Sequence, residues 1–536
     1  MNAVDAEEIK AIDLDYYMTH RHYFDEGLES IDEETKTAGL QLSLVPTRRL
    51  LLAARFLRDI HYYAWIGDEK GHFVRYIRGK WHDNVHQALS AAIQLYIDHL
   101  ALPPTTYRKG IIMDNIQQAS HHYMHELNRN KEILNFRNGF LDTTDFSMDS
   151  ENTEKKHLFT YQIPHAYKPG AGSRVFLPWL FEMLEGNWDS IDLVLKFIGY
   201  AMTLDVGFQR NLIIKGPPRS GKSTLLNVIA AMVGEDNRAM VPLQRLSRRF
   251  GTTGIVHKIL NYYVDISTTR AIYDTSRIKI LIDEEIDVEF KGGALTRVKN
   301  VTKHIFSTNR LPPVKALDLA YCRRWAIVEF PRELSREEVI PGFEARIIED
   351  EREMEGIIAI CVDAYKELVN DGYFKAQSAE EVMELIMAET DSVYRFVRDC
   401  CDVGPQFYDD QDTVYTAYVE FAEADGALDI KKKGEFTKDL KSKGYGKRRA
   451  GSKNSAGKRP YLYTGLKLQE SEYYAMSPTS TPSFDNFYPE KRETKEELGF
   501  SLEDACRDEI LEEIEDINEG DEDNEDFDTV GDPFNL

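Results

Sequence analysis

A glycine-rich loop pattern constrains this chain more than any other feature. Residues 211–224 read NLIIKGPPRSGKST and match the pattern GxxxxGK[ST] at every defined position. The apolar run before the loop predicts a β-strand, and STLLNVIAAMV after it has helical spacing. Glycines let backbone N–H groups turn toward phosphates, and the helix start adds the positive end of its dipole. The sequence therefore predicts an α/β core that binds ATP through Gly216, Pro217, Pro218, Arg219, Ser220, Gly221, Lys222, Ser223 and Thr224.

Such a loop needs an acidic residue at the end of a neighbouring strand. Lys222 is expected to bridge the β- and γ-phosphates, and Ser223 to hold Mg²⁺ together with that acid. Two candidates follow apolar runs: Asp265 after KILNYYV, and the group Asp283–Glu285 after IKILI.

Connection length favours Asp265 as the metal ligand. The next parallel strand is predicted at 303–309, and parallel strands need a crossover of about a dozen residues, usually a helix. Between Glu285 and Lys303 the sequence has only a hairpin pattern around Gly292-Gly293. The segment 283–285 stays open as the less favoured alternative.

Two polar features flank the next predicted strands. Asn309 ends the strand at 303–309 and is placed to orient a water molecule beside the γ-phosphate. The pair Arg323-Arg324 precedes the apolar run WAIVEF. Paired arginines at that point are typical of a finger that reaches the phosphate of a neighbouring subunit and stabilises transition-state charge.

The order of these motifs resembles that of the superfamily 3 helicases of viruses and plasmids. GPPRSGKST is followed by YYVDIS, DVEFKGG, FSTNRLPP and CRRWAIVEFP. The helicase halves of phage and plasmid primase–helicases and of the poxvirus primase–helicase are the most similar. Upstream, LNFRNGFLD at 134–142, with HLFTYQIPHAYKPGA after it, looks like the domain that precedes the helicase in that family. The resemblance spans about residues 50–470.

The resemblance implies an AAA+-type ATPase that forms a hexameric ring, with ATP and Mg²⁺ bound between subunits. Lys222, Ser223, Asp265 and Asn309 would act in cis, and Arg324 (or Arg323) in trans. The hairpin at 291–293 would project into a central channel around single-stranded or forked DNA. Phosphate contact requires Lys or Arg, and the candidates near this hairpin are Lys291, Arg297, Lys299 and Lys303.

The chain departs from the family in two places. Its loop carries Arg219-Ser220 where relatives often have a small residue and Asn. About 130 residues precede the 134–142 segment, and they contain no paired-aspartate strand motif with a following His. We therefore expect no primase half and no priming activity in this chain.

A basic stretch lies near the C-terminal end. Residues 431–459 hold 12 bases and 2 acids. The segment EFTKDLKSKG has the spacing of a short helix, and GYGKRRAGSKNSAGKRPYLYTGLKL reads as two strands around a loop. A helix followed by a basic hairpin is typical of a winged-helix DNA-binding domain, with phosphate contacts from Lys447, Arg448, Arg449, Lys458 and Arg459.

The formal net charge of −25 is concentrated at the ends of the chain. Residues 490–536 hold 20 acids and 4 bases, and residues 1–36 hold 11 acids and 3 bases. The segment between them is therefore near neutral, so the overall charge does not exclude DNA as a partner. Both ends are expected to be weakly ordered. The acidic tail, which ends in DPFNL, is a candidate docking segment for a replication protein.

Localisation follows from what the sequence lacks. No apolar run approaches the roughly 18 residues of a membrane helix. The five cysteines form no CxxC pair, and the N-terminus does not resemble a leader peptide. We expect a protein of the host-cell cytoplasm or nucleoid. The predicted domains are an acidic segment (1–46), an associated N-terminal domain (47–170), the ATPase core (171–335), a helical connector (336–404), the winged helix (405–469) and the disordered tail (470–536).

Together these features predict an ATP-dependent DNA helicase for the replication of a virus, plasmid or integrated mobile element. The alternative is an ATP-regulated, origin-binding initiator with little processive unwinding. A third hypothesis is a P-loop ATPase of defence or packaging that does not unwind DNA.

Overall fold

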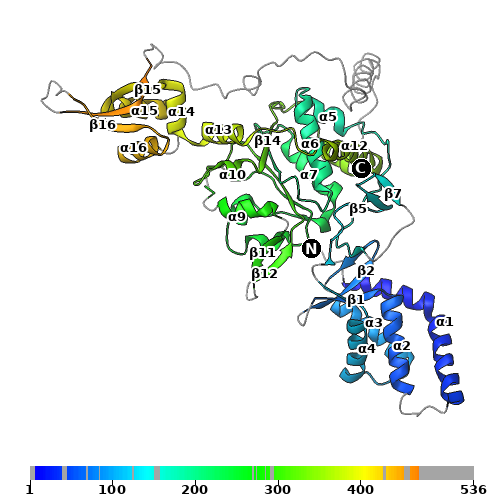
Figure 1. Cartoon of the computed structure of the whole chain (residues 1–536). Coiled ribbons are helices and arrows are strands. Elements are labelled where there is room, and N and C mark those ends of the chain that lie inside the picture. The colour runs from blue at the N-terminus through cyan, green and yellow to red at the C-terminus, as the bar shows by residue number, and fades with distance from the viewer. Residues whose placement is uncertain are drawn as a thin grey trace, which may run out of the picture. The chain divides into compact units, whose positions relative to one another are not determined.

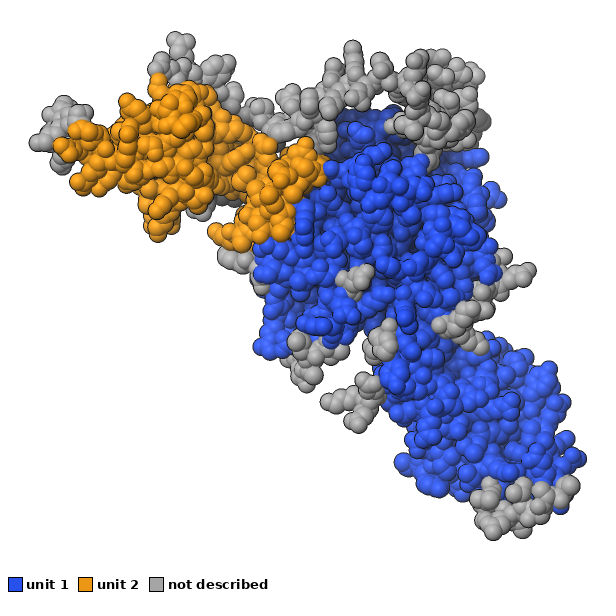
Figure 2. All heavy atoms as spheres, in the orientation of Figure 1, with its two compact units in different colours: residues 1–266, 274–309, 323–376 blue, residues 267–273, 310–322, 377–536 orange. Residues whose placement is uncertain are grey.

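The chain divides into two compact units (Figures 1 and 2). The computed structural model describes residues 6–38, 45–67, 71–83, 85–123, 126–149, 157–267, 271–272, 275–283, 285–289, 295–425, 430–451 and 459–469. Unit 1 comprises residues 1–266, 274–309 and 323–376, and unit 2 comprises 267–273, 310–322 and 377–536. The prediction of one continuous core over 171–335 did not anticipate that 310–322 would group with later residues. The acidic tail lies outside the described residues.

The N-terminal part of unit 1 is mainly helical. Its helices are α1 (Ala6–Ala38), α2 (Val45–Asp59), α3 (His86–His99) and α4 (Thr106–Ala119). They bury one apolar cluster that includes Leu57, Leu89 and Ile93. A four-stranded sheet has the order β3 (Lys80–His82), β2 (His72–Ile77), β1 (Tyr63–Ile66) and β4 (His121–His122). Strands β1 and β2 pair in an antiparallel manner, as the turn signals Gly67-Asp68 and Gly71 between two strand-like runs of the sequence predict.

The prediction that the first 36 residues are only partly ordered is wrong. Helix α1 is 33 residues long, and Asp13 on it is buried. The Asp13 carboxylate accepts hydrogen bonds from the Tyr63 hydroxyl at 2.7 Å and the Arg75 guanidinium at 2.9 Å, and lies 2.7 Å from His61 Nδ1. Charge counting along the chain cannot reveal partners that are 48 or more residues away, so it predicts a solvated acid at Asp13.

A small meander and two helices precede the central sheet. Strands β5 (Ile133–Phe136), β6 (Gly139–Asp142) and β7 (Ser147–Asp149) pair in an antiparallel manner. They contain the 134–142 segment singled out in the sequence. Helices α5 (Phe176–Met183) and α6 (Trp188–Ala201) follow, in agreement with the apolar helical spacing there.

A five-stranded parallel sheet forms the centre of unit 1. Its order is β14 (Trp325–Glu329), β8 (Asn211–Lys215), β13 (Lys303–Thr308), β10 (Leu260–Tyr263) and β9 (Arg238–Ala239). All pairings are parallel, and every residue of β13 is buried, as expected for a strand covered on both faces. Helix α7 (Lys222–Val233) contacts β10 and β13, and α6 contacts β14. The predicted α/β class, with a helical N-terminal region and a parallel sheet, is confirmed.

The two acidic candidates follow segments that differ in their relation to the parallel sheet. Strand β10, which precedes Asp265, belongs to the parallel sheet beside β13. The alternative segment lies between α9 (Thr275–Lys279) with its 3₁₀ turn and a separate antiparallel ribbon. That ribbon consists of β11 (Glu285–Glu289) and β12 (Leu295–Lys299). The crossover argument for the strand before Asp265 is therefore confirmed.

One buried carboxylate joins the segment that precedes the sheet in the sequence to the segment that follows it. Glu353 lies in the first turn of α12 (Glu351–Asp371), which follows α11 (Phe343–Ile348). It accepts hydrogen bonds from Ser173 Oγ at 2.5 Å and from the backbone N–H groups of Arg174, Val175 and Phe176 at 3.0, 3.0 and 2.8 Å. These donors would otherwise be left unpaired at the buried start of α5, so Glu353 acts as the cap of that helix.

Unit 2 contains a mixed helix–strand module. Helices α10 (Leu319–Cys322) and α13 (Ala379–Thr390) contact each other before it. The module comprises α14 (Ser392–Cys400), β15 (Cys401–Asp410), α15 (Gln411–Ala424), α16 (Lys433–Ser442), β16 (Gly446–Arg449) and β17 (Tyr461–Leu468). Its sheet is antiparallel in the order β15, β17, β16, over a core that includes Phe396, Tyr418 and Phe436. The predicted division between 404 and 405 falls inside β15, so the module begins earlier, at α14.

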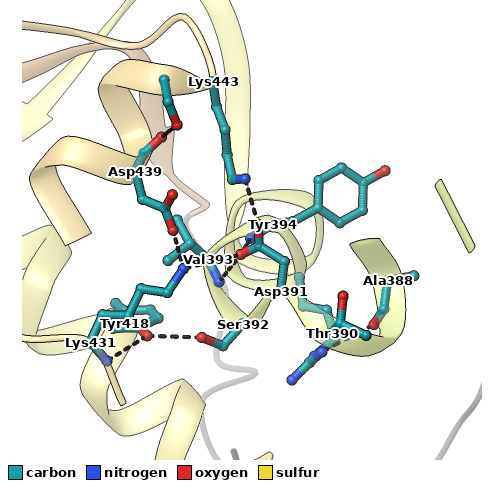
Figure 3. A network of polar contacts seen from close by, with 12 residues as sticks. Ala388, Thr390, Asp391, Ser392, Val393, Tyr394, Tyr418, Lys431, Asp439 and Lys443 are labelled. Atoms are coloured by element: carbon teal, nitrogen blue, oxygen red, sulfur yellow. Dashed lines mark hydrogen bonds and ion pairs between the residues drawn. The ribbon is translucent and has the colours of Figure 1, made fainter. Parts of the chain in front are cut away.

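Asp391 holds the helices of this module together (Figure 3). Its carboxylate caps α14 by accepting from the N–H groups of Val393 and Tyr394, both at 3.0 Å. The ammonium group of Lys443 lies 2.5 Å from it. Burial raises the pKa of this carboxyl, but the Lys443 contact and the other lysine and backbone partners outweigh it and leave the pKa below its ordinary value.

Two further features concern localisation. Within the part of the chain that the structure describes, no helix combines the length and apolarity needed to cross a membrane. Cys322, Cys361, Cys400 and Cys401 are free thiols.

We predict that Glu353→Ala lowers the free energy of unfolding by about 3 kcal/mol, because it leaves several buried donors unsatisfied. Urea unfolding followed by circular dichroism measures this change. Glu349→Ala is the matched control, because Glu349 is exposed and lies four residues earlier. Equal stability of the two variants would contradict the capping role.

Candidate functional site

The loop at 216–221 lies between β8 and α7 and is closed by Lys222. The Lys222 ammonium group donates to the carbonyl oxygen of Gly216 at 2.8 Å, to that of Pro217, and to Ser220 Oγ at 3.0 Å. Ser220 Oγ in turn donates to the Pro217 carbonyl at 2.9 Å. The lysine is therefore largely buried beneath the loop that it stabilises.

Both glycines of the motif are required by close packing. A Cβ atom on Gly216 would lie 2.3 Å from the backbone oxygen of Phe330. A Cβ atom on Gly221 would lie 2.7 Å from the Trp179 ring, and its φ of +78° is also unfavourable for other residues. Trp179 and Met183, which line Gly221, belong to α5 and were not identified from the sequence.

Arg219 is directed away from the lysine. Its guanidinium donates to the Leu334 carbonyl at 3.0 Å and to Glu333 at 2.7 Å. Arg219 is exposed and has a φ of +57°. The Arg219 side chain thus links the loop to the segment after β14. This contact gives a structural role to Arg219, at which the chain departs from the family pattern.

The first turn of α7 leaves donors available for an anion. The first intrahelical bond runs from the Leu225 N–H to the Gly221 carbonyl at 3.0 Å, and no side chain caps the start of the helix. Ser223 is exposed and Thr224 is partly buried. The N–H groups of this turn and the positive end of the helix dipole therefore face the same region as the Ser223 hydroxyl.

Asp265 lies beside this loop at the same edge of the sheet. It follows β10, is exposed, and has a φ of +58°. Its N–H donates to Ser307 Oγ at 3.1 Å, and the next N–H, of Ile266, donates to the Ser307 carbonyl at 2.9 Å. Ser307 is thus a positioning residue that sequence analysis missed, since only the parallel pairing of β10 and β13 brings it to Asp265.

Electrostatic coupling confirms that the loop and the acid are close. Burial lowers the pKa of Lys222, and the negative charge of Asp265 partly opposes that shift. Asn309 follows β13 directly and is exposed, and the neighbouring Gly216 N–H donates to the Thr308 carbonyl at 3.2 Å. The structure therefore brings the loop, Asp265 and Asn309 to the carboxyl edge of the sheet, where parallel sheets bind ligands.

The arginine pair lies at the opposite edge. Trp325, the first residue of β14, pairs with Asn211, and the Asn211 N–H donates to the Arg324 carbonyl at 2.8 Å. The five-residue strand β8 separates this point from the loop by roughly 16 Å at about 3.3 Å per residue. Neither arginine can reach the loop of its own subunit from there.

The preference for Arg324 over Arg323 is reversed by burial. Arg324 is 8% exposed, and its Nε donates to the Lys279 carbonyl at 2.9 Å. Arg323 is exposed. A residue that reaches a neighbouring subunit needs an accessible guanidinium, so Arg323 is the better candidate of the two.

The residues near the hairpin that are expected to contact DNA differ in their exposure and in their contacts within the chain. Lys291 lies outside the described residues. Arg297 is exposed but pairs with Asp287 at 3.2 Å and Glu285 at 4.0 Å. Lys299 donates to the carbonyl oxygens of Asn128 and Arg129, both at 3.2 Å.

The prediction that Lys303 contacts DNA is wrong. Lys303 is 1% exposed and donates to the carbonyl oxygens of Thr203 and Val301. Burial lowers its pKa from the ordinary value of 10.5 to about 7, with weak opposition from Asp205. A basic residue near a hairpin was taken for a surface residue, but β13 is the central strand and carries Lys303 into the core.

The basic residues of the C-terminal module are exposed where they are described. Lys447, Arg448 and Arg449 form β16, and Arg459 lies before β17. Lys458 lies outside the described residues. The structure therefore places four of these five predicted contacts on the surface of unit 2.

The residues present suit ATP and Mg²⁺. The uncapped helix start, the two glycines at close approach and Lys222 make a cradle for phosphates. Ser223 and Asp265 offer exposed oxygen ligands of the kind Mg²⁺ prefers. Among the described residues there is no cluster of three or more His, Cys, Asp or Glu side chains that would hold a metal by itself.

Comparisons with known families match two segments of the chain. Residues 54–185 match the family described as D5 N terminal like, and residues 214–324 match a family of unknown function, DUF5906. No curated protein matches the chain.

Two of the solved structures that match the chain are distantly similar to it. One described as "The A form apo structure of NrS-1 C terminal region-CTR" is 13% identical, with a TM-score of 0.45, covering 77% of this chain and 98% of that one. Another, "The apo structure of NrS-1 C terminal region (305-718)", is 14% identical, with a TM-score of 0.46, covering 78% and 100%. The two family matches confirm the resemblance in its coarser form, to phage and viral primase–helicase-like proteins.

We predict a specific pH dependence of stability from Lys303. Between about pH 7 and 10.5 the unfolded chain holds the Lys303 proton and the folded chain does not, so stability rises with pH across this window. Lys303→Met should lack this increment, which has a slope of up to about 1.4 kcal/mol per pH unit. Urea unfolding at pH 7, 8, 9 and 10 measures it. The exposed-lysine control Lys315→Met should follow the wild-type profile, and an unchanged profile for Lys303→Met would contradict the assignment.

Proposed function

We propose that this chain is an ATP-dependent DNA helicase that works as a ring-shaped oligomer, a hexamer, in the replication of a virus, plasmid or mobile element. The observation that carries the proposal is the meeting of the 216–221 loop, Lys222, Asp265 and Asn309 at the carboxyl edge of one parallel sheet. The ordered motifs and the D5 N terminal like match support the same class of protein.

Each residue at this edge has a distinct role in the proposal. The N–H groups of the loop and first turn, with Lys222, would hold the phosphates, while Ser223 and Asp265 would hold Mg²⁺. Asn309 would orient the attacking water. Bound ATP would supply the free energy for movement along DNA through transfer of its γ-phosphoryl group to water, with ADP as the leaving group.

The separation of Arg323 from the loop supports an oligomer. A site whose loop and arginine lie at opposite edges of one sheet is incomplete within a single subunit. The proposal completes it with Arg323 of a neighbouring copy, which would stabilise negative charge in the transition state.

The C-terminal module supports DNA as the substrate. Its three helices and three-stranded antiparallel sheet, which ends in a basic hairpin, support the proposal that it is a winged helix. An origin-binding initiator with little unwinding would use the same module, and strand displacement distinguishes it from a helicase.

We predict that Lys222→Ala reduces ATP hydrolysis at least 100-fold, because it removes a preorganised cation from the phosphates. It should also abolish displacement of a labelled strand from forked DNA. The control is Lys109→Ala on α4, which should keep both activities. Hydrolysis without displacement in the wild-type chain would favour the initiator, and full hydrolysis by Lys222→Ala would contradict the proposed site.

We predict that Arg323→Ala lowers hydrolysis by about 1,000-fold and leaves ATP binding intact, because the arginine acts on the neighbouring site. Mixing it with Lys222→Ala should restore part of the hydrolysis. At a mixed interface, the intact loop of one variant meets the intact arginine of the other. Failure of this complementation, with both variants folded and assembled, would refute the role in trans. Arg324→Ala should instead lower thermal stability, because Arg324 is buried.

A further inference from the structure

A small surface of the C-terminal module combines exposed rings with exposed cations. We call it the β16 surface and define it by Tyr408, Lys447, Arg448, Arg449 and Tyr461. It spans all three strands of the sheet, in the order β15, β17, β16. Figure 1 labels the two outer strands, β15 and β16. Its tyrosines are unusually accessible for large side chains, with 54% of Tyr408 and 41% of Tyr461 exposed.

Each ring on this surface is held by a neighbouring cation. Lys447 Nζ lies 4.3 Å and Arg449 Cζ 5.1 Å from the centre of the Tyr461 ring. Arg448 Cζ lies 5.0 Å from the centre of the Tyr408 ring. Such cation–π contacts orient the rings while leaving them partly exposed to a ligand.

Strand register explains why the surface has two faces. Arg449 lies opposite Tyr461, and Lys447 lies opposite Tyr463, so these residues share one face of the sheet. Arg448 alternates to the other face, where it meets Tyr408 across β17. The hairpin therefore presents one ring with a cation on either face.

The charges of the module are divided unequally. On its helical side, Lys431 pairs with Asp439, Lys433 with Asp412 and Lys443 with Asp391 (Figure 3 shows the first and the last). Lys447, Arg448 and Arg449 have no carboxylate partner among the residues that the structure describes. Exposed positive charge that could meet a polyanion therefore remains on β16, as it does at Lys438 and Lys441 of α16.

Helix α16 is less suited to reading bases than the winged-helix prediction implies. It buries Phe436 and Leu440 and exposes Lys438 and Lys441. Its sequence, KGEFTKDLKS, contains no Asn or Gln to contact adenine and no Arg, so Lys is the one residue type on it that could make a bidentate contact, to guanine. This helix offers charge to a duplex but little means of specific recognition.

We propose that the β16 surface is a binding site for single-stranded DNA, with unpaired bases stacked on Tyr408 and Tyr461 and phosphates held by Lys447, Arg448 and Arg449. Exposed aromatic rings beside unpaired cations are the combination that single-strand binding requires, because every base has a π-face and every nucleotide a phosphate. The inference rests on the proposed function only in taking DNA as the partner.

The test measures binding of the full chain to a labelled 20-nucleotide oligothymidylate and to a duplex of the same length, by fluorescence anisotropy. The double variant Tyr408→Leu/Tyr461→Leu should bind the single strand about 10-fold or more weakly, since one stacked base contributes a factor of roughly 5 to 100. The salt dependence should stay unchanged, because no phosphate contact is lost. Tyr408→Phe/Tyr461→Phe keeps both rings and should bind within twofold of wild type.

A second pair of variants tests the competing surface. Lys438→Ser/Lys441→Ser removes two charges from α16 and should leave single-strand affinity within twofold. The inference is overturned if the Leu pair binds the single strand as wild type does, or if duplex is preferred and the α16 variant loses it. Normal ATP hydrolysis with an ineffective Leu pair would refute only this inference. Failure to bind any DNA would refute both it and the proposed function, and thermal unfolding of each variant verifies its fold.

Discussion

The buried Glu353 carboxylate is the contact on which the geometry of the candidate site depends. It accepts four hydrogen bonds at the start of α5 and so fixes that helix to α12. Trp179 and Met183 of α5 in turn pack against Gly221, where no side chain would fit. The shape of the loop therefore depends on a residue about 130 positions later in the chain. Because a buried donor without a partner is costly, this cap leaves α5 little freedom to move.

The candidate site residues lie at opposite ends of the strands of the parallel sheet. Strands β8, β10 and β13 end side by side, so the residues that follow them meet without being close in sequence. Arg323 and Arg324 precede β14 and consequently lie at the opposite edge. The parallel strand order brings the loop, Asp265 and Asn309 together but places Arg323 at the other end of the strands. In an oligomer, the arginine of one subunit could complete the site of its neighbour.

The effect of a charged side chain depends on whether an opposite charge lies beside it. The total of −25 suggests an acidic protein, yet Asp13 is neutralised in the helical N-terminal core and several lysines of the module are neutralised by aspartates. The bases on β16 are few, but within the described part of the chain no carboxylate pairs with them. Position and pairing, more than net charge, decide which surface attracts a polyanion.

The sequence by itself determined the strand–loop–helix around Lys222, the class of the fold and the choice of the strand before Asp265, because spacing and crossover length are local properties. It also located the hairpin at Gly67 and the basic strand at 447–449. Only the tertiary structure decided that Lys303 is buried, that Arg323 is the accessible arginine, that Ser307 positions Asp265 and that α1 belongs to a core. These properties arise from contacts between segments that are tens to hundreds of residues apart in the sequence. A local residue pattern does not indicate which side of a strand or helix such packing will bury.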